Sequence, residues 1–208
     1  DPGLFLEVNP VATGKRLVAR DDDSYILTGE YTTSLTLDGI GEDISRSVGP
    51  SNDGNTDIFL ASYTSNHNLQ WVVDIAGTGI DTVEALTIGP DNELYLGGYL
   101  MNALNFGVAP LHDAVNRQTR EIFLAKYSPE GNIEWVTMGG GDSTDQLRDI
   151  VLTPNGGPLV TGTFVAELSI SATLEVQQEL SYSGVFLAQY TPDGAPLWLR
   201  HVGGTGSH

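Results

Sequence analysis

Acidic side chains are the groups in this chain whose types and spacing could support chemistry. Asp21, Asp22 and Asp23 are consecutive, and a loop containing Asp53 and Asp57 carries further oxygen ligands. Carboxylates so close together can share a hard cation such as Ca²⁺, although this loop lacks the spaced acids and final Glu of an EF-hand. Aspartate also favours turns, because its side chain bonds to nearby backbone. Two hypotheses follow, a calcium site and a turn, and the turn is favoured for the three consecutive aspartates.

The remaining candidate groups have no catalytic spacing. The chain has no cysteine, which excludes disulfides, Cys-zinc sites and thiol nucleophiles. Its four histidines show no His-Glu-x-x-His spacing, and there is no Gly-x-Ser-x-Gly elbow. The Gly-rich stretches 77–79 and 139–141 open no helix and are typical of bends between strands. We therefore expect no catalytic residue and no cofactor other than Ca²⁺.

The charge of the chain limits its partners. The 208 residues include 9 Lys plus Arg against 27 Asp plus Glu, a formal net charge of −18. Nucleic acid needs a cationic face, and so does an anionic membrane surface. No stretch approaches the roughly 18 apolar residues of a membrane span. The expected partners are other protein chains or a second copy of this chain, with no nucleic acid and no membrane insertion.

The elements that must position any site come from one pattern that occurs three times. Each copy reads Phe-Leu-Ala-x-Tyr, then a turn, then Trp eight residues after the Tyr. Phe123 lies 64 residues after Phe59, and Phe186 lies 63 residues after Phe123. A fixed period of this length indicates a repeat architecture. The repeated aromatic residues, which we expect to be buried at equivalent places, are Phe59, Tyr63, Trp71, Phe123, Tyr127, Trp135, Phe186, Tyr190 and Trp198.

The turn in each copy has its own signature. Pro129 and Pro192 stand where φ near −65° is needed, and Gly131 and Gly194 stand where φ is positive. His67 occupies the glycine position in the first copy. Histidine is enriched at positive φ, so the pattern predicts the same turn there.

A second shared hairpin completes the unit. Residues 16–31, 83–99 and 147–164 each give an apolar strand, a polar turn and a strand ending in Gly and an aromatic. The strands are apolar on both faces, as in sheets covered on both sides. Four such antiparallel strands per repeat predict the blade of a β-propeller.

The pattern resembles the bacterial β-propeller repeats of the seven-bladed type found in secreted and surface proteins. The matching segments are Phe123–Tyr127, Gly131-Asn132, Trp135, Gly139–Gly141, Ile150–Leu152, Asn155-Gly156 and Val160–Gly162. The turn-plus-Trp element is also similar to the docking motif of quinoprotein dehydrogenase propellers, in which the Trp is structural. The resemblance implies an extracellular or cell-surface scaffold.

The predicted fold is thus all-β, a partial or split propeller with repeats of about 64 residues. The single segment 1–208 divides into a partial unit 1–56, the units 57–120 and 121–183, and a partial unit 184–208. Both ends then carry half a blade, which predicts either a dimer completing a ring or an arc resting on neighbouring sequence or chains.

Two functions remain open, beside a third possibility, a Ca²⁺-stabilised adhesin module. The first is a non-enzymatic scaffold for protein interaction or adhesion, because packing and turns explain every repeated residue. The alternative is a glycan-binding or glycan-processing propeller that uses acidic loop residues. A cleft with two carboxylates and a nearby aromatic side chain would favour it.

Overall fold

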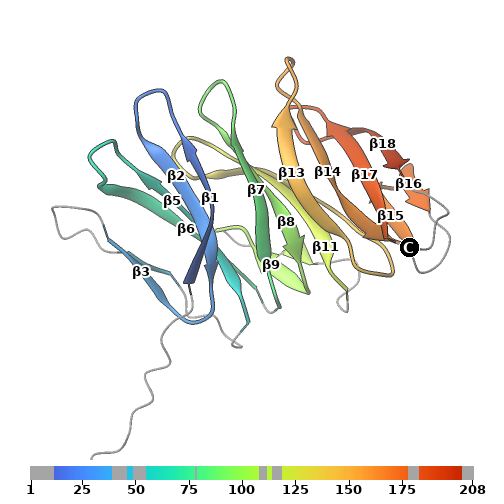
Figure 1. The fold of residues 1–208 in the computed structure, drawn as a ribbon, viewed down its shortest axis with the longest axis horizontal. Coiled ribbons are helices and arrows are strands. Elements are labelled where there is room, and N and C mark those ends of the chain that lie inside the picture. Colours follow the sequence, from blue (N-terminus) through green and yellow to red (C-terminus); the bar gives the residue numbers. More distant parts are fainter. Residues whose placement is uncertain are drawn as a thin grey trace, which may run out of the picture.

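The fold is a row of three antiparallel β-sheets that stand side by side (Figure 1). It was obtained as a computed structural model, which describes residues 12–38, 46–48, 55–77, 79–107, 112–113, 119–177 and 183–202. All of the regular elements in these ranges are strands. The protein is all-β, and its sheets are the blades of a partial β-propeller.

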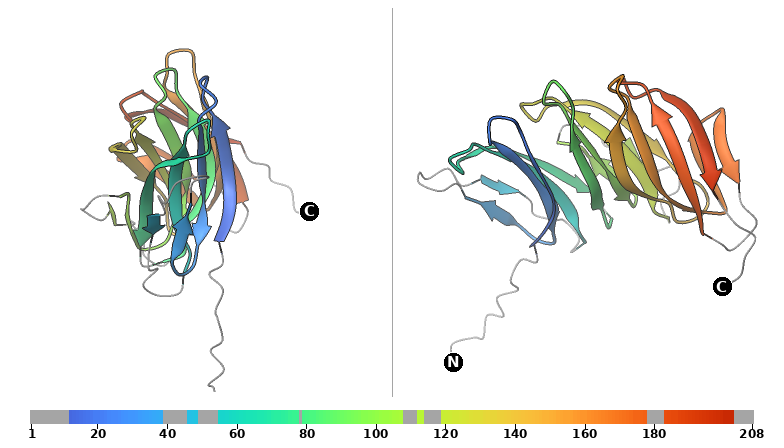
Figure 2. Two further views of the ribbon diagram at one scale, coloured as in Figure 1. Left: turned by 90° about the vertical axis from the view of Figure 1, so that its left-hand side faces the viewer. Right: turned by 45° about the horizontal axis from the view of Figure 1, so that its top comes forward.

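Each blade has four strands in sequence order from the inner to the outer edge, and two short strands of a connection extend the first sheet to six. The first blade comprises β1 (Ala12–Ala19), β2 (Tyr25–Tyr31), β5 (Asp57–Tyr63) and β6 (Leu69–Gly77). The second comprises β7 (Thr82–Ile88), β8 (Leu94–Leu100), β11 (Glu121–Tyr127) and β12 (Ile133–Gly139). The third comprises β13 (Gln146–Leu152), β14 (Pro158–Val165), β17 (Ser183–Tyr190) and β18 (Pro196–Val202). The inner strand β7 packs between β1 and β13, so the blades fan out from their inner strands (Figure 2).

Short strands lie in the connections within each blade, and two of these connections tie neighbouring blades together. The short strands are β3 (Leu35–Leu37), β4 (Arg46–Val48), β9 (Ala103–Asn105), β10 (His112–Asp113), β15 (Glu167–Ser171) and β16 (Leu174–Gln177). The second blade's connection sends β9 to pair with β6 of the first blade, with Asn105 opposite Ala76. The third blade's connection bridges to the end of the second blade through Ser169 and Gly140. Each link adds backbone hydrogen bonds between blades.

The strand pairing corrects the predicted half-blades. β2 pairs with β5, with Tyr31 opposite Asp57. β14 pairs with β17, with Phe164 opposite Gly184. Both terminal hairpins therefore belong to complete blades within this chain, and the prediction that the row ends in two half-blades is wrong. A sequence period gives the spacing of the strands, but it does not show which hairpins pair in one sheet. The boundaries of the blades therefore differ from those of the predicted units.

The two faces of a blade pack in opposite directions. Phe123, Ala125 and Tyr127 of the second blade share a core with Ile58 and Leu60 of the first. One blade later, the core is made of Phe186, Ala188 and Tyr190 packed with Ile122 and Leu124. The Phe-x-Ala-x-Tyr side of each blade is its leading face, which packs on the preceding blade. The opposite side is its trailing face, which packs on the following blade.

The repeated aromatic residues divide into two groups. Phe59, Phe123 and Phe186 are 3%, 0% and 0% exposed, which confirms their predicted burial. The three repeated Trp side chains are only half-buried, so the prediction that they are buried like the Phe side chains is wrong. The reason is that each Trp lies on the outer strand of its blade, close to the surface.

The turn predictions are confirmed. Gly131 and Gly194 both have φ of 83°, and His67 has φ of 65°. The histidine therefore adopts the left-handed conformation that its position in the repeat requires.

Candidate functional site

The interface between the first two blades contains a Trp–turn contact. The Trp71 Nε1–H on β6 donates to the carbonyl of Pro129, which lies in the β11–β12 turn, at 3.2 Å. Gly131 of that turn lies so close to the indole that an added Cβ would stand 2.9 Å from Trp71 Cε3. Arg20 donates a second hydrogen bond to the same Pro129 carbonyl at 3.0 Å.

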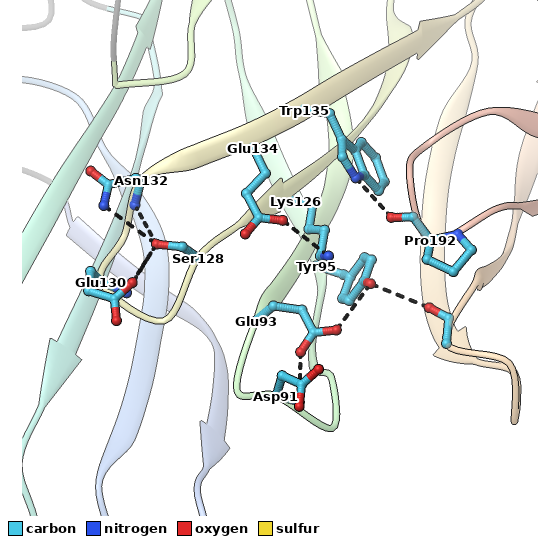
Figure 3. Close-up of polar contacts among 11 residues, drawn as sticks. Asp91, Glu93, Tyr95, Lys126, Ser128, Glu130, Asn132, Glu134, Trp135 and Pro192 are labelled. Carbon is cyan, nitrogen blue, oxygen red and sulfur yellow. Dashed lines mark hydrogen bonds and ion pairs between the residues drawn. The ribbon is translucent and has the colours of Figure 1, made fainter.

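The interface between the second and third blades repeats the contact (Figure 3). The Trp135 Nε1–H donates to the Pro192 carbonyl at 3.0 Å, and a Cβ on Gly194 would stand 2.7 Å from Trp135 Cδ2. Tyr95 packs edge-on against Trp135, with ring centroids 6.0 Å apart. Lys126 pairs with Glu134 beside Trp135 at 3.1 Å. The hydrogen bond from Trp135 to the Pro192 carbonyl joins the second and third blades.

The third Trp has a different partner. The Trp198 Nε1–H donates to Gln189 Oε1 at 2.8 Å, and Gln189 lies directly opposite on β17. The Arg200 guanidinium lies over the Trp198 ring, 6.0 Å from its centroid. Among the described residues, no turn of a following blade contacts this indole.

The trailing face of the third blade is exposed where the other two blades bury theirs. Ile122 and Leu124 on the second blade are each 2% exposed, whereas their counterpart Val185 is 45% exposed and Leu187 is half-buried. Val151 on β13 and Val202 on β18 are exposed as well. We call Val151, Val185, Leu187 and Val202 the trailing apolar patch. A hollow of about 60 Å³ lies between Val151 and Leu187.

The leading side of the first blade is built differently. Tyr25 stacks on Tyr63 with ring centroids 5.2 Å apart, and His67 Nδ1 lies 3.2 Å from the Tyr25 hydroxyl. Leu37 of β3 joins the buried cluster on this side. Leu17 on the inner strand is exposed, although the corresponding residues of the other blades are buried. On the outer half of this side, residues of the first blade and of β3 therefore cover the apolar side chains.

A cleft of about 550 Å³ lies between the outer edges of the first two blades. Its lining includes Trp71, Asp74, Glu130 and Asn132. Asp74 accepts a hydrogen bond from the Tyr31 hydroxyl at 2.5 Å, and Glu130 is exposed to solvent. Burial, together with the Asp74 carboxylate, raises the pKa of Tyr31 well above its usual value. The cleft thus combines two carboxylates, an amide and an indole.

The aspartates proposed as calcium ligands are not gathered into one site. Asp22 accepts the backbone N–H of Ser24 at 3.0 Å, and hydrogen bonding by the Ser24 side chain and backbone lowers the pKa of the Asp22 carboxyl. Asp23 has φ of 62°. Both are consistent with the turn between β1 and β2, of which Asp21 is also part. Asp57 is buried and accepts the N–H of Gly77 at 2.9 Å. Asp53 lies outside the described residues. Within the described ranges, no three acidic or histidine side chains come together as a metal site.

The structure also reveals a buried carboxyl group that the sequence reasoning missed. Asp145 is 0% exposed and accepts backbone N–H groups of Gly141 at 2.9 Å and Val165 at 3.4 Å. Burial, together with the nearby carboxylates of Glu121 and Glu167, raises the pKa of Asp145 to about 7, although these hydrogen bonds lower it. Its counterpart Asp81 accepts the N–H of Met101 at 3.2 Å. The two aspartates lie one period apart, which was the available signal.

Comparison with known proteins is consistent with the class that the blades define. No protein-family model matches the chain. The chain is 23% identical over 223 aligned positions to an uncharacterized WD repeat-containing protein of Acanthamoeba polyphaga mimivirus, an alignment that covers 88% of this chain. It spans only 16% of that relative's length. The similarity is to a repeat propeller protein and does not point to bacterial repeats in particular. Within the described residues there is no helix of the length and apolar character needed to cross a membrane.

Proposed function

We propose that this chain is a non-enzymatic protein-interaction scaffold of a secreted or cell-surface protein, an adhesion module being one form of it. The observation that carries the proposal is the trailing apolar patch on the third blade. Three of its four residues, Val185, Leu187 and Val202, stand at positions that the first two blades bury against a neighbour. An apolar surface built like an interface favours a protein partner, because covering it removes apolar area from water.

The roles of the repeated residues support the proposal of a non-enzymatic scaffold. The aromatic side chains of the repeat pack the blades, and the buried carboxyl of Asp145 is held by backbone N–H groups at a blade interface. Lys126 pairs with Glu134 and lies over Tyr95 within the second blade, and the Tyr95 hydroxyl donates to the Gly156 carbonyl of the third blade. The packing of blades on one another explains these groups. It does not explain the exposed apolar face of the third blade.

The test compares a patch variant with a matched core variant. Val185→Lys adds a charge to an exposed position, so the chain is expected to fold normally and to lose a protein that wild type retains from secreted material. Ile122→Lys places the same charge in a buried interface and is expected to unfold the chain. The retained protein is identified, purified and rebound to both chains. Equal retention by wild type and by Val185→Lys would contradict the proposal, as would hydrolysis of polysaccharide substrates by the purified chain.

The extracellular or cell-surface location is part of the same proposal. The strongly acidic composition suits a solvated surface, and the resemblance to secreted propeller repeats points the same way. Protease treatment of intact source cells tests it, since a surface protein is cleaved while cytoplasmic markers survive. Survival of the protein until the cells are lysed would contradict the location.

The cleft between the first two blades supports a second candidate function, glycan binding. Its combination of the Trp71 indole with the carboxylates of Asp74 and Glu130 suits the apolar face and hydroxyl groups of a sugar. Titration with a panel of soluble neutral oligosaccharides, followed by NMR, tests it. Glu130→Gln should weaken any binding, whereas Asp193→Asn, at the equivalent turn position outside the cleft, should not. Absence of spectral change with every oligosaccharide would remove this candidate.

A further inference from the structure

We propose that the trailing face of the third blade docks a further blade of this same repeat, whose Pro-x-Gly turn packs on Trp198. The first blade of a second copy of this chain is excluded as that partner. The inference rests on the interaction surface assigned under the proposed function. It specifies the chemistry of the partner.

The chain itself contains the docking contact twice. In both interfaces the outer-strand indole donates to the carbonyl of the turn proline of the next blade, at 3.2 Å for Trp71 and 3.0 Å for Trp135. In both, the turn glycine lies on the indole with φ of 83°. Two independent occurrences with the same donor, acceptor and glycine define what a partner of the third Trp must supply.

Trp198 occupies the same position in its blade, but side chains of its own blade take the place of the turn contacts. Gln189 accepts the indole N–H, and Arg200 lies over the ring. Both are long side chains that can move aside when a turn arrives. The exchange replaces a side-chain acceptor by a backbone carbonyl, as in the other two interfaces.

The surface beneath Trp198 matches the rest of such a blade. Ile58 and Leu60 on the first blade receive a Phe-x-Ala-x-Tyr strand, as do Ile122 and Leu124 on the second. Val185 and Leu187 are the equivalent pair on the third blade, and they keep the apolar character of those positions. The expected partner is therefore a blade with a Phe-x-Ala-x-Tyr strand on its leading face.

A second copy of this chain lacks the required turn. Its first blade carries His67 at the glycine position, with Ser65 in place of the proline. A Cβ at the glycine position would stand 2.7–2.9 Å from the indole in either existing interface, closer than real Cβ contacts. The glycine turns at Gly131 and Gly194 are already covered by Trp71 and Trp135 of their own chain. Head-to-tail pairing of copies through Trp198 is thus blocked sterically.

The experiment appends a blade to the chain. A second copy of residues 140–202 is placed directly after Val202, which is equivalent to Gly139, so that the repeat continues in register. All tryptophans are replaced biosynthetically by 5-fluorotryptophan, and Trp198 is assigned in the ¹⁹F NMR spectrum with Trp198→Phe. The exposure of each indole is measured by the broadening that a soluble gadolinium chelate causes. The matched control carries Gly194→Val in the appended copy only.

The expected result is that the appended blade lowers the broadening of Trp198 to the level of Trp135, and that the control restores it. Hydrogen exchange reports whether the appended strands are folded. If that copy is not folded, residues 76–139 are appended instead, and failure of both to fold on the chain counts against the proposal. A folded appended blade that leaves Trp198 as exposed as in the original chain overturns it.

The exclusion of a second copy is tested with the unextended chain. The Trp198 signal should remain broadened by the chelate at every protein concentration. Protection that grows with concentration and appears in sedimentation as dimers abolished by Trp198→Ala would overturn the exclusion. If Trp198 stays exposed beneath a folded appended blade while Val185→Lys still abolishes partner retention, the docking inference fails and the interaction scaffold stands.

Discussion

The sharpest prediction concerns the glycine that lies against the second interface Trp. Gly194→Ala changes one hydrogen to a methyl group in a turn with φ of 83°. The new Cβ would lie 2.7 Å from Trp135 Cδ2 and 2.9 Å from Cε3, so the rigid indole must move. Gly156 provides the matched control. It has φ of 79°, but its nearest neighbour to an added Cβ is Pro192 Cγ at 3.9 Å, an ordinary contact.

The magnitude has two parts. Alanine in the left-handed region costs about 1–2 kcal/mol at either position, which is the whole cost for Gly156→Ala. At Gly194 the displaced indole also loses its hydrogen bond to the Pro192 carbonyl, about 1 kcal/mol, and is forced from its preferred rotamer, about 1 kcal/mol. Gly194→Ala should therefore lower the free energy of unfolding by roughly 2 kcal/mol more than Gly156→Ala.

Urea unfolding of both variants measures this difference. With a slope of about 2 kcal/mol per molar urea, the excess corresponds to a midpoint lower by about 1 M. The same two substitutions are then made in a Trp135→Ala background. There the excess at Gly194 should vanish, because the atoms that the methyl group would strike are gone. Equal costs for the two glycine variants in the wild-type background, or an excess that persists without the indole, would refute the docking contact as the reason for the glycine.

Three further predictions follow from the core, the buried carboxyl group and the aspartate turn. Phe123→Ala should lower the free energy of unfolding by about 3–5 kcal/mol in urea titration, because the ring is fully buried between two blades; a loss below about 1 kcal/mol would contradict that packing. Because the pKa of Asp145 is about 7 in the folded chain and near 3.8 when unfolded, the native state holds the proton more tightly between these values. Stability should thus fall by roughly 4 kcal/mol as the pH rises through this window, and Asp145→Asn should flatten the profile; equal slopes for both chains would argue against the raised pKa. Since Asp22 already accepts a hydrogen bond within its own turn, EDTA should leave the melting temperature unchanged, and a fall that added Ca²⁺ reverses would restore the calcium hypothesis.

Several features of the fold could be predicted from residue types and spacing alone. The period of the aromatic residues predicted repeated antiparallel hairpins, and the Pro-x-Gly signature predicted left-handed turns, including the one at His67. These inferences succeed because they depend on local backbone preferences and on the alternation of side chains along a strand, both of which are written into short segments.

Other features required the folded chain. The buried state of Asp145 arises where three segments meet, the strand that begins at Glu121 and the backbone at Gly141 and Val165. The cleft beside Trp71 likewise combines residues from two blades. The spacing of Asp81 and Asp145 marks the position in the repeat, but the burial of Asp145 and the lining of the cleft depend on which hairpins become neighbours.

By itself the sequence determined the type of blade, its three-fold occurrence and the conformation of its turns, because these follow from local propensity and period. Only the tertiary structure decided how the hairpins group into blades, because a repeat period does not show where in the repeat each blade begins. It also decided that three equivalent Trp residues have different surroundings. Trp71 and Trp135 each contact a following turn, whereas Trp198 bonds within its own blade beside an exposed apolar face. The residues are alike in type, and their difference comes from whether another blade covers them.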